Sequence, residues 1–448
     1  MTWAARFQLR QHFRQSLWAV PLLGAIVGAA LAGVDLGLEA RVTMPASWSY
    51  SPSTASSVLT TVSGAMIGLL GLVVTVGVLV VQMATGTLSP RFMRLWYRDR
   101  LQKLVLAAFT ATFAFSFALL GTVEAGSVPD LGVTMAGIAV AVDLVLLLLY
   151  LDRFVHALRP VAVAAAVARA GLAVVAEVDQ AGIELQAGDD SPREVEGRSV
   201  QVRARKSGAI QAMDARGMVD LATRHDLTCV LTCSVGDFVN AGAVVMDVHG
   251  SPDRRVLRRL RGKIALGHER TIDQDSAYAV RIIVDIAIRA LSPAVNDPTT
   301  AVQVLDYIED LLLHLARRWP DGDGEFRDAQ GRCLVLIPVR RWEQYLELAT
   351  TEIRQYGAAS IQVLRRLRAT LEELAAEVPP QHRQPVEREL RKLDLTVTTN
   401  FPTEVDRPLA DASDRQGIGG PHARAVGSGT SAPTDDDGRG QPSAVSMT

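Results

Sequence analysis

The sequence predicts an α-helical membrane region of four transmembrane helices, followed by an α+β cytoplasmic domain with a small β-sandwich-like unit and C-terminal helices. Three observations support this class. Four long apolar stretches lie within the first 151 residues, and positive charge gathers in alternate gaps between them. Behind the fourth stretch, short alternating segments with turn glycines are followed by amphipathic helical patterns.

The four apolar stretches place residues 1–152 in the membrane region. Each is long enough to cross a bilayer core as a helix, which takes ~20 apolar residues. A buried helix of a soluble protein rarely stays apolar on every face over such a length. The expected spans are Leu17 to Leu38, Val58 to Ala84, Leu104 to Val123 and Leu131 to Leu151.

The first span has an alternative interpretation, because Ala30-Leu31-Ala32 resembles a signal-peptidase site. The charged region before it is long and the apolar run continues past it, which favours an uncleaved span. Cleavage would leave three spans without moving the large domain.

Arginine and lysine predict the orientation in the membrane. They cluster before the first span, between the second and third, and after the fourth, whereas the other two gaps hold only Arg41. We therefore expect a multi-pass protein of the inner (plasma) membrane, with its N-terminus and C-terminal domain in the cytoplasm. The clustered residues are Arg6, Arg10, Arg14, Arg91, Arg94, Arg98, Arg100, Lys103, Arg153 and Arg159.

Asp143 is the one clear ionisable residue well inside an expected span, since Asp35 and Glu124 lie at outer ends where water is available. A carboxylate in the bilayer core is costly unless it is paired, hydrated or protonated. It indicates either an ion or proton pathway or a carboxyl group hydrogen-bonded to a neighbouring helix. The partners expected on the second span are Thr60, Thr61, Ser63 and Thr75.

Small residues recur at four-residue spacing in the first two spans. In lipid, helices associate where small residues let their backbones approach closely. The spacing indicates tight packing within the chain or, alternatively, a face that forms a homo-oligomer or lines a pore. The pairs are Gly24 and Gly28, Gly33 and Gly37, and Gly64 and Gly68.

Residues 153–198 are expected to form a linker, in which an alanine-rich helix from Pro160 to Val178 leaves the membrane. Residues 199–250 predict a small β-rich subdomain. There the run from Gly236 to Gly242, Gly-Asp-Phe-Val-Asn-Ala-Gly, is similar to half of a biotinyl- or lipoyl-type β sandwich, with glycines at tight turns. The lysine that carries the cofactor in such domains is missing from the run, so we expect no cofactor.

The cysteines and the net charge restrict the function further. Cys229, Cys233 and Cys333 cannot all pair within one chain and indicate reduced thiols. No second Cys or His pair stands at metal-binding spacing, so no metal is expected. A net charge of -2 argues against a nucleic-acid partner.

Residues 251–400 predict a mainly helical cytoplasmic domain, and the Gly-, Ser- and Pro-rich residues 401–448 predict a disordered tail. The helical domain opens with a basic helix. It is either a solvated face or a contact for anionic lipid headgroups or a phosphorylated ligand. The lipid-contact candidates are Arg254, Arg255, Arg258 and Arg259.

A corner between two helices carries the most distinctive residues of the chain. Pro293 ends the first helix, and Asn296 or Asp297 caps the next, with Pro298 at its first position. The corner is either structural or a ligand site beside a helix N-terminus. The ligand-binding candidates are Ser292, Asn296, Asp297, Thr299, His268 and Arg270.

These residues also carry a family resemblance. The run from Ala290 to Pro298, together with Gly267 to Thr271, Asp285 to Ala287 and Leu88 to Arg91, resembles the bacterial predicted membrane protein family called domain of unknown function 2254. The resemblance covers roughly residues 10–375 and implies four N-terminal spans, a soluble C-terminal part and no established activity. The family's usual aromatic residue after Asp-Pro is Thr299 here, so a role that needs a ring at this position does not carry over.

Three function classes remain. The sequence holds no phosphate-binding loop, dinucleotide fingerprint, His-Glu-x-x-His or Gly-x-Ser-x-Gly, so we assign no catalytic residue and an enzyme is least favoured. A channel or small-solute transporter predicts Asp143 facing a small, polar face of the second span. A membrane-anchored sensor or scaffold predicts Asp143 buried against a neighbour. An enzyme predicts a deep cytoplasmic pocket around the corner and His268.

Overall fold

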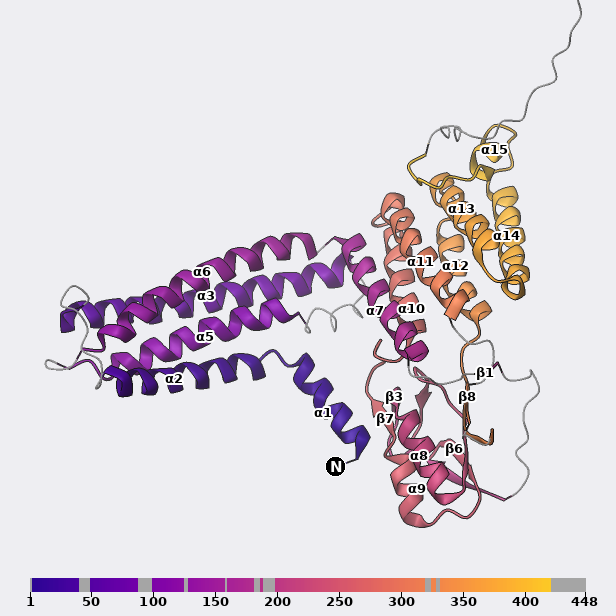
Figure 1. Cartoon of the computed structure of the whole chain (residues 1–448). Helices are drawn as coiled ribbons and strands as arrows, with labels where there is room; N and C mark the ends of the chain where they lie inside the picture. The colour runs from indigo at the N-terminus through magenta and orange to yellow at the C-terminus, as the bar shows by residue number, and fades with distance from the viewer. Residues whose placement is uncertain are drawn as a thin grey trace, which may run out of the picture.

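A long helical bundle leads at one end into a mixed α/β region in the computed structural model (Figure 1). The structure describes residues 2–39, 49–87, 99–124, 128–157, 159–180, 186–187, 198–318, 324–327 and 331–419. The motif Leu88 to Arg91 and the basic residues Arg94 and Arg98 lie outside the described residues. The bundle consists of α2 (Ala19–Glu39), α3 (Pro52–Thr87), α5 (Arg100–Leu120) and α6 (Asp130–Ala157). Before it, α1 (Trp3–Gln15) turns away from α2 toward the α/β region (Figure 1).

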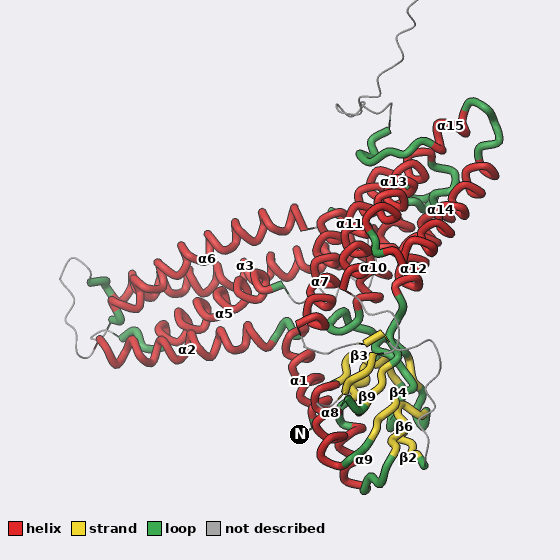
Figure 2. Tube along the Cα trace, turned by 45° about the vertical axis from the view of Figure 1, so that its right-hand side comes forward, coloured by secondary structure: helices red, strands yellow, loops and turns green. Residues whose placement is uncertain are grey.

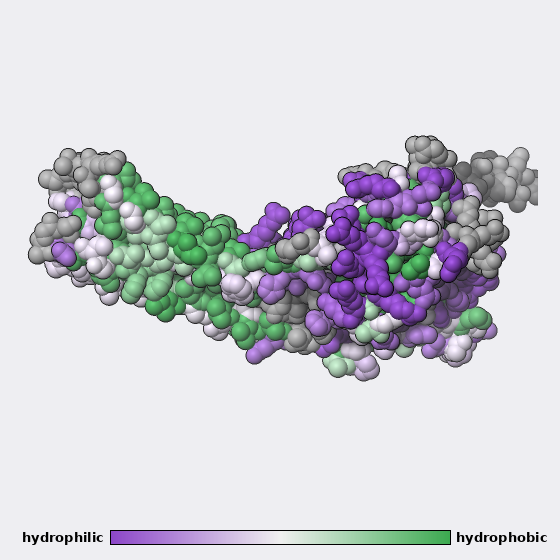
Figure 3. All heavy atoms as spheres, turned by 90° about the horizontal axis from the view of Figure 1, so that it is seen from below, coloured by the Kyte–Doolittle hydropathy of each residue, from purple (hydrophilic) through white to green (hydrophobic). Residues whose placement is uncertain are grey.

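Five helices of the described chain are long and apolar enough to cross a membrane, whereas the sequence predicts four. The four expected spans are confirmed as such helices, and the bundle has a largely hydrophobic surface (Figure 3). The fifth is α7 (Pro160–Gln180), whose alanines and valines give it the composition of a span. In its most apolar window 44% of the residues are buried inside the protein, against 17–39% for the other four.

Close backbone contact holds α2 to α5, which also contacts α3 and α6. Gly24 and Gly28 lie against Ala107 and Ala111, so close that a Cβ on either glycine would overlap an alanine carbonyl. Tight packing within the chain is therefore confirmed for this glycine pair. The other glycines of the pattern have open space beside them: Gly33, Gly37, Gly64 and Gly68.

The β unit consists of two sheets with an apolar core, accompanied by α8 (Ala215–His225) and α9 (Arg254–Arg261) (Figure 2). The strand orders are β1-β8-β9-β4-β6-β2 and β5-β3-β7. The turn prediction is confirmed, because Gly236 and Gly242 have φ values of +94° and +85°. The strands are β1 (Gln186–Ala187), β2 (Ser199–Arg203), β3 (Gly208–Met213), β4 (Thr228–Leu231), β5 (Phe238–Val239), β6 (Val244–His249), β7 (Ile264–Gly267), β8 (Gly324–Arg327) and β9 (Cys333–Ile337).

The expected boundary of the β-rich subdomain at residue 250 is wrong. The sheets also take in β7, β8 and β9, and β4 pairs with β9 in parallel across about a hundred residues of sequence. Strand pairing between such distant segments leaves no local pattern in the sequence.

The helical layer packs around one apolar core that includes α7. Val163, Val167 and Val175 of α7 are buried against α10 and α11. The helices of this layer are α10 (Ser276–Ala290), α11 (Pro298–Arg318), α12 (Trp342–Tyr356), α13 (Ile361–Glu377), α14 (Pro380–Asn400) and α15 (Asp406–Asp411).

The expected disordered tail starts too early. Residues 401–419 contain α15 and pack against α13, and residues 420–448 lie outside the described residues. Asp414 is buried and accepts hydrogen bonds from the backbone N–H groups of Gln416, Gly417 and Gly419 at 2.9–3.1 Å. These side-chain-to-backbone hydrogen bonds order the segment although it has few large apolar residues. Composition alone therefore wrongly predicts disorder for residues 401–419.

Candidate functional site

The helix that precedes the first span is attached to the β unit. Thr2 caps α1 by accepting a hydrogen bond from the N–H of Ala5. One face of α1 then lies along β7. Three hydrogen bonds join α1 to β7 and to the segments before and after it, from Ala4 N to Gly262 O (3.0 Å), from Gln8 Nε2 to Leu266 O, and from Gln11 Nε2 to Asp273 Oδ2.

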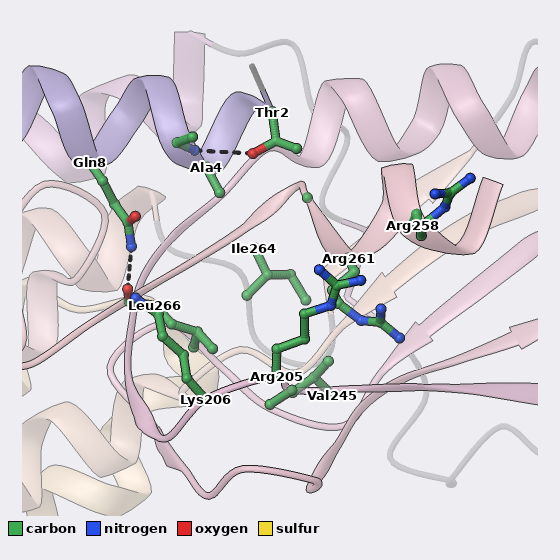
Figure 4. A pocket seen from close by; sticks show the side chains of 13 residues that line it. Thr2, Ala4, Gln8, Arg205, Lys206, Val245, Arg258, Arg261, Ile264 and Leu266 are labelled. Atoms are coloured by element: carbon green, nitrogen blue, oxygen red, sulfur yellow. Dashed lines mark hydrogen bonds between the residues drawn. The ribbon is translucent and has the colours of Figure 1, made fainter. Parts of the chain in front are cut away.

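A cavity of about 430 Å³ opens at this contact between α1 and the β unit (Figure 4). Its floor is apolar and includes Val245, Ile264 and Leu266. Four cationic side chains line it as well: Arg205 and Lys206 from the turn between β2 and β3, and Arg258 and Arg261 from α9. The cavity therefore combines an apolar surface with a concentration of positive charge.

The positive charge of this cavity is not neutralised within the described chain. None of its lining residues is an aspartate or glutamate. Among the residues that the structure describes, its arginines and lysine form no ion pair. The Nε atom of Arg261 is buried and has no hydrogen-bond partner there.

Local sequence fixes which arginines of α9 reach the cavity. Asp253 caps the helix, with its Oδ1 accepting from Val256 N at 2.6 Å. Val256 and Leu260 are buried in the core of the β unit and so set the rotation of the helix. All four lipid-contact candidates are exposed, and Arg258 is the one among them that lines the cavity, whereas Arg254, Arg255 and Arg259 lie outside it.

A second cavity of about 410 Å³ lies between the β unit and the helical layer. Asp275 lines it, is only 7% exposed, and caps α10 by accepting from Tyr278 N at 2.9 Å. Burial raises the pKa of Asp275 from 3.8 to about 6, although the hydrogen bond from Tyr278 N opposes this. Nearby, the hydroxyl groups of Ser276 and Tyr345 lie 2.7 Å apart, and burial raises the pKa of Tyr345 above its ordinary value.

The ligand-binding candidates from the sequence do not lie together. Arg270 lines the second cavity, whereas His268 is exposed and lines neither cavity. At the corner, Ser292 Oγ donates to Arg289 O at 2.7 Å. Asp297 caps α11 by accepting from the N–H and hydroxyl of Thr300 at 3.0 and 2.6 Å. Asn296 has a φ of +48° and is exposed, as is Thr299.

These contacts support the structural interpretation of the corner. Its hydrogen bonds are made within the corner and the adjoining helix ends, and neither cavity is lined by Ser292, Asn296, Asp297 or Thr299.

Asp143 is enclosed in the helical bundle. It is 1% exposed and hydrogen-bonds to Thr112 of α5, a partner on the third span and not on the second. Thr61 and Thr75 on α3 are exposed and donate back to their own helix, to Ser57 O and Gly71 O at 2.7 and 2.8 Å.

Sequence reasoning missed Asp35. Its position near the outer end of α2 suggests access to water, but the side chain is 3% exposed and lies against Gly132 of α6. Neither carboxyl oxygen has a hydrogen-bond partner among the described residues, and the same holds for Oδ2 of Asp143. Gly132 of α6, which leaves room for the Asp35 side chain, is the one feature of the sequence that signals this close approach of the two helices.

The thiols and acidic groups define no metal centre in the described chain. Burial raises the pKa of Cys229 to about 12 and that of Cys233 to about 11, so both are unreactive thiols at neutral pH. Within the described residues, no three His, Cys, Asp or Glu side chains are grouped to hold a metal ion.

An apolar helical bundle with a hydrophilic α/β region at one end defines the class, a multi-pass membrane protein with a large domain outside the bilayer. Residues 14–373 match the family described as "Predicted membrane protein (DUF2254)", and the chain belongs to this family. It is 30% identical over 439 residues to the uncharacterized proteins Rv1290c of Mycobacterium tuberculosis and Mb1321c of Mycobacterium bovis, covering 94% of this chain and 82% of each relative. No solved structure matches the chain.

Proposed function

We propose that the protein is a membrane-anchored cytoplasmic sensor with four transmembrane helices, α2, α3, α5 and α6. The observation that carries this proposal is the attachment of α1 to the β unit. The segment before the first span and the domain after the last lie on one side of the membrane, so the chain crosses it an even number of times. An even number of crossings excludes one of the five apolar helices, and α7 is the one that lies buried against α10 and α11.

The charge pattern supports a cytoplasmic position for this side. Arg6, Arg10 and Arg14 lie on α1, and Arg153 lies at the same end of the bundle, beside Asp99. In membrane proteins, the short segments on the cytoplasmic side carry an excess of lysine and arginine.

A physical connection leads from the cavity to the bundle. Only three residues separate the end of α1 from the start of α2. Lys103 at the start of α5 donates its Nζ to Arg14 O, and Thr110 Oγ1 donates to Pro21 O at 2.8 Å. A ligand that moves α1 against the β unit therefore acts directly on the cytoplasmic ends of α2 and α5.

Hydrogen exchange of the full chain in proteoliposomes tests this connection. The double variant Gln8→Ala, Gln11→Ala removes two of the hydrogen bonds to the β unit, and we expect faster exchange at residues 19–24. His12→Ala is the matched control, because His12 is an exposed residue of the same helix. Equal exchange in wild type and both variants would mean that α1 transmits nothing to the spans.

A second candidate function, proton or ion passage, is favoured by the buried oxygens of Asp35 and Asp143 that have no partner among the described residues. One observation speaks against this function. Asp143 of α6 is enclosed in the bundle and does not line the open space beside Gly64 and Gly68 of α3.

Flux in liposomes separates the two functions. A sensor is expected to give no more ion flux than empty liposomes, with or without Asp143→Asn. A wild-type flux that Asp143→Asn lowers by about tenfold or more would favour the pathway instead.

A further inference from the structure

We infer that the cavity between α1 and the β unit binds a phosphate ester. This inference rests on the proposed sensor function, because it names the ligand of the same site. It is carried by the four cationic side chains, the absence of a carboxylate among the lining residues, and the buried Nε of Arg261.

The charges favour an anion of more than one negative charge. Like charges that share one cavity repel each other, and a buried donor without a partner is unfavourable. A phosphate group relieves both, because its oxygens accept charge-assisted hydrogen bonds from guanidinium groups in two-point contacts. Arg205, Arg258 and Arg261 supply three such groups, and Lys206 adds a compact charge.

The shape of the cavity adds an apolar part to the ligand. Val245, Ile264 and Leu266 form its floor, and Ala4 and Ala5 of α1 complete the apolar lining. A volume of about 430 Å³ falls in the usual range for sites of small organic ligands. Inorganic phosphate alone would leave this surface uncovered, so the ligand carries an organic group beside its phosphate.

Two sources supply this chemistry, a free phosphorylated metabolite and the headgroup of an anionic membrane lipid. Both present a phosphate ester joined to a less polar body. The cavity is open to the cytoplasm by the present topology, and α1 connects it directly to a membrane span, so the protein has access to both sources.

Binding to the full-length protein tests the inference. The protein is placed in nanodiscs of phosphatidylcholine and titrated with inorganic pyrophosphate and with adenosine monophosphate in a calorimeter. In a second arm, phosphatidylglycerol replaces part of the phosphatidylcholine, and the shift of the unfolding temperature is measured. Binding of adenosine monophosphate in the first arm identifies a free metabolite as the source, with weaker binding expected for pyrophosphate because it lacks an organic group. A stabilising shift in the second arm identifies a lipid.

Matched variants of α9 locate the binding. Arg258→Gln and Arg261→Gln are each expected to weaken binding, or reduce the lipid shift, by about tenfold. Arg254→Gln and Arg255→Gln change the same charge on exposed positions outside the cavity and are expected to have less than about a twofold effect. Unchanged unfolding temperatures without ligand verify that the variants are folded.

Two results would overturn the inference. One is no response to either soluble probe or to phosphatidylglycerol, and the other is equal weakening by all four variants, which would mean attraction by overall charge. Neither result affects the connection between α1 and α2, which the exchange experiment measures separately. Conversely, binding that leaves exchange at residues 19–24 unchanged would refute the sensor function and leave the site intact.

Discussion

Asp275 places a carboxyl group with a raised pKa between the β unit and the helical layer. Its surroundings carry both signs of charge, since Arg270 and Arg340 favour the carboxylate and Asp237 opposes it. Burial outweighs the arginines, and the pKa rises to about 6. The folded protein therefore binds more protons than the unfolded chain between about pH 4 and pH 6, and its stability falls as the pH rises through this window.

Asp275→Asn is expected to remove this pH dependence. Asparagine retains a side-chain oxygen that can cap α10, and it carries no charge to bury. The variant should exceed the wild type in free energy of unfolding by on the order of 3 kcal/mol at pH 8, with the difference shrinking toward pH 5. Thermal or denaturant unfolding across this pH range measures it. A difference that is the same at both pH values would contradict the role assigned to the carboxyl group.

At the level of elements, the contact between α2 and α5 depends on two glycines. Gly28→Ala places a methyl group on the backbone of Ala111 and is expected to destabilise the bundle by about 1–3 kcal/mol. Gly33→Ala is the matched control in the same helix, because its added methyl meets open space and improves helix propensity. Unfolding in detergent should thus shift in opposite directions for the two variants. Equal shifts would mean that the close approach is not energetically important.

Helix patterns were readable from the sequence, whereas contacts between distant elements were not. The four spans, the turn glycines and the capped corner at Asp297 all follow from local composition and spacing. The cavity does not, because Gln8 meets Leu266 across 258 positions and no local pattern marks that contact. The sequence predicts a basic helix at α9, but it does not show which of its arginines line the cavity. The burial of Val256 and Leu260 sets the rotation of the helix and so brings Arg258 and Arg261 to the cavity.

For the whole molecule, α7 is the element on which hydropathy and packing disagree. Its length and composition suit a span, yet its valines are buried against α10 and α11. Composition cannot distinguish a helix that is apolar because lipid surrounds it from one that is apolar because protein surrounds it. The hydrogen bonds from α1 to the β unit support the proposed four spans, because a fifth span would move the β unit to the side opposite α1.

Cysteine labelling in intact cells tests this topology most directly. Ser53→Cys lies at the end of α3 that faces outward in a four-span protein, and Ser251→Cys is exposed on the β unit. The unaltered chain, whose own cysteines are buried or half-buried, serves as the blank. With a membrane-impermeant maleimide, we predict labelling of Ser53→Cys in intact cells and of Ser251→Cys only after the membrane is opened. Labelling of Ser251→Cys in intact cells would contradict the four-span, cytoplasmic-domain account.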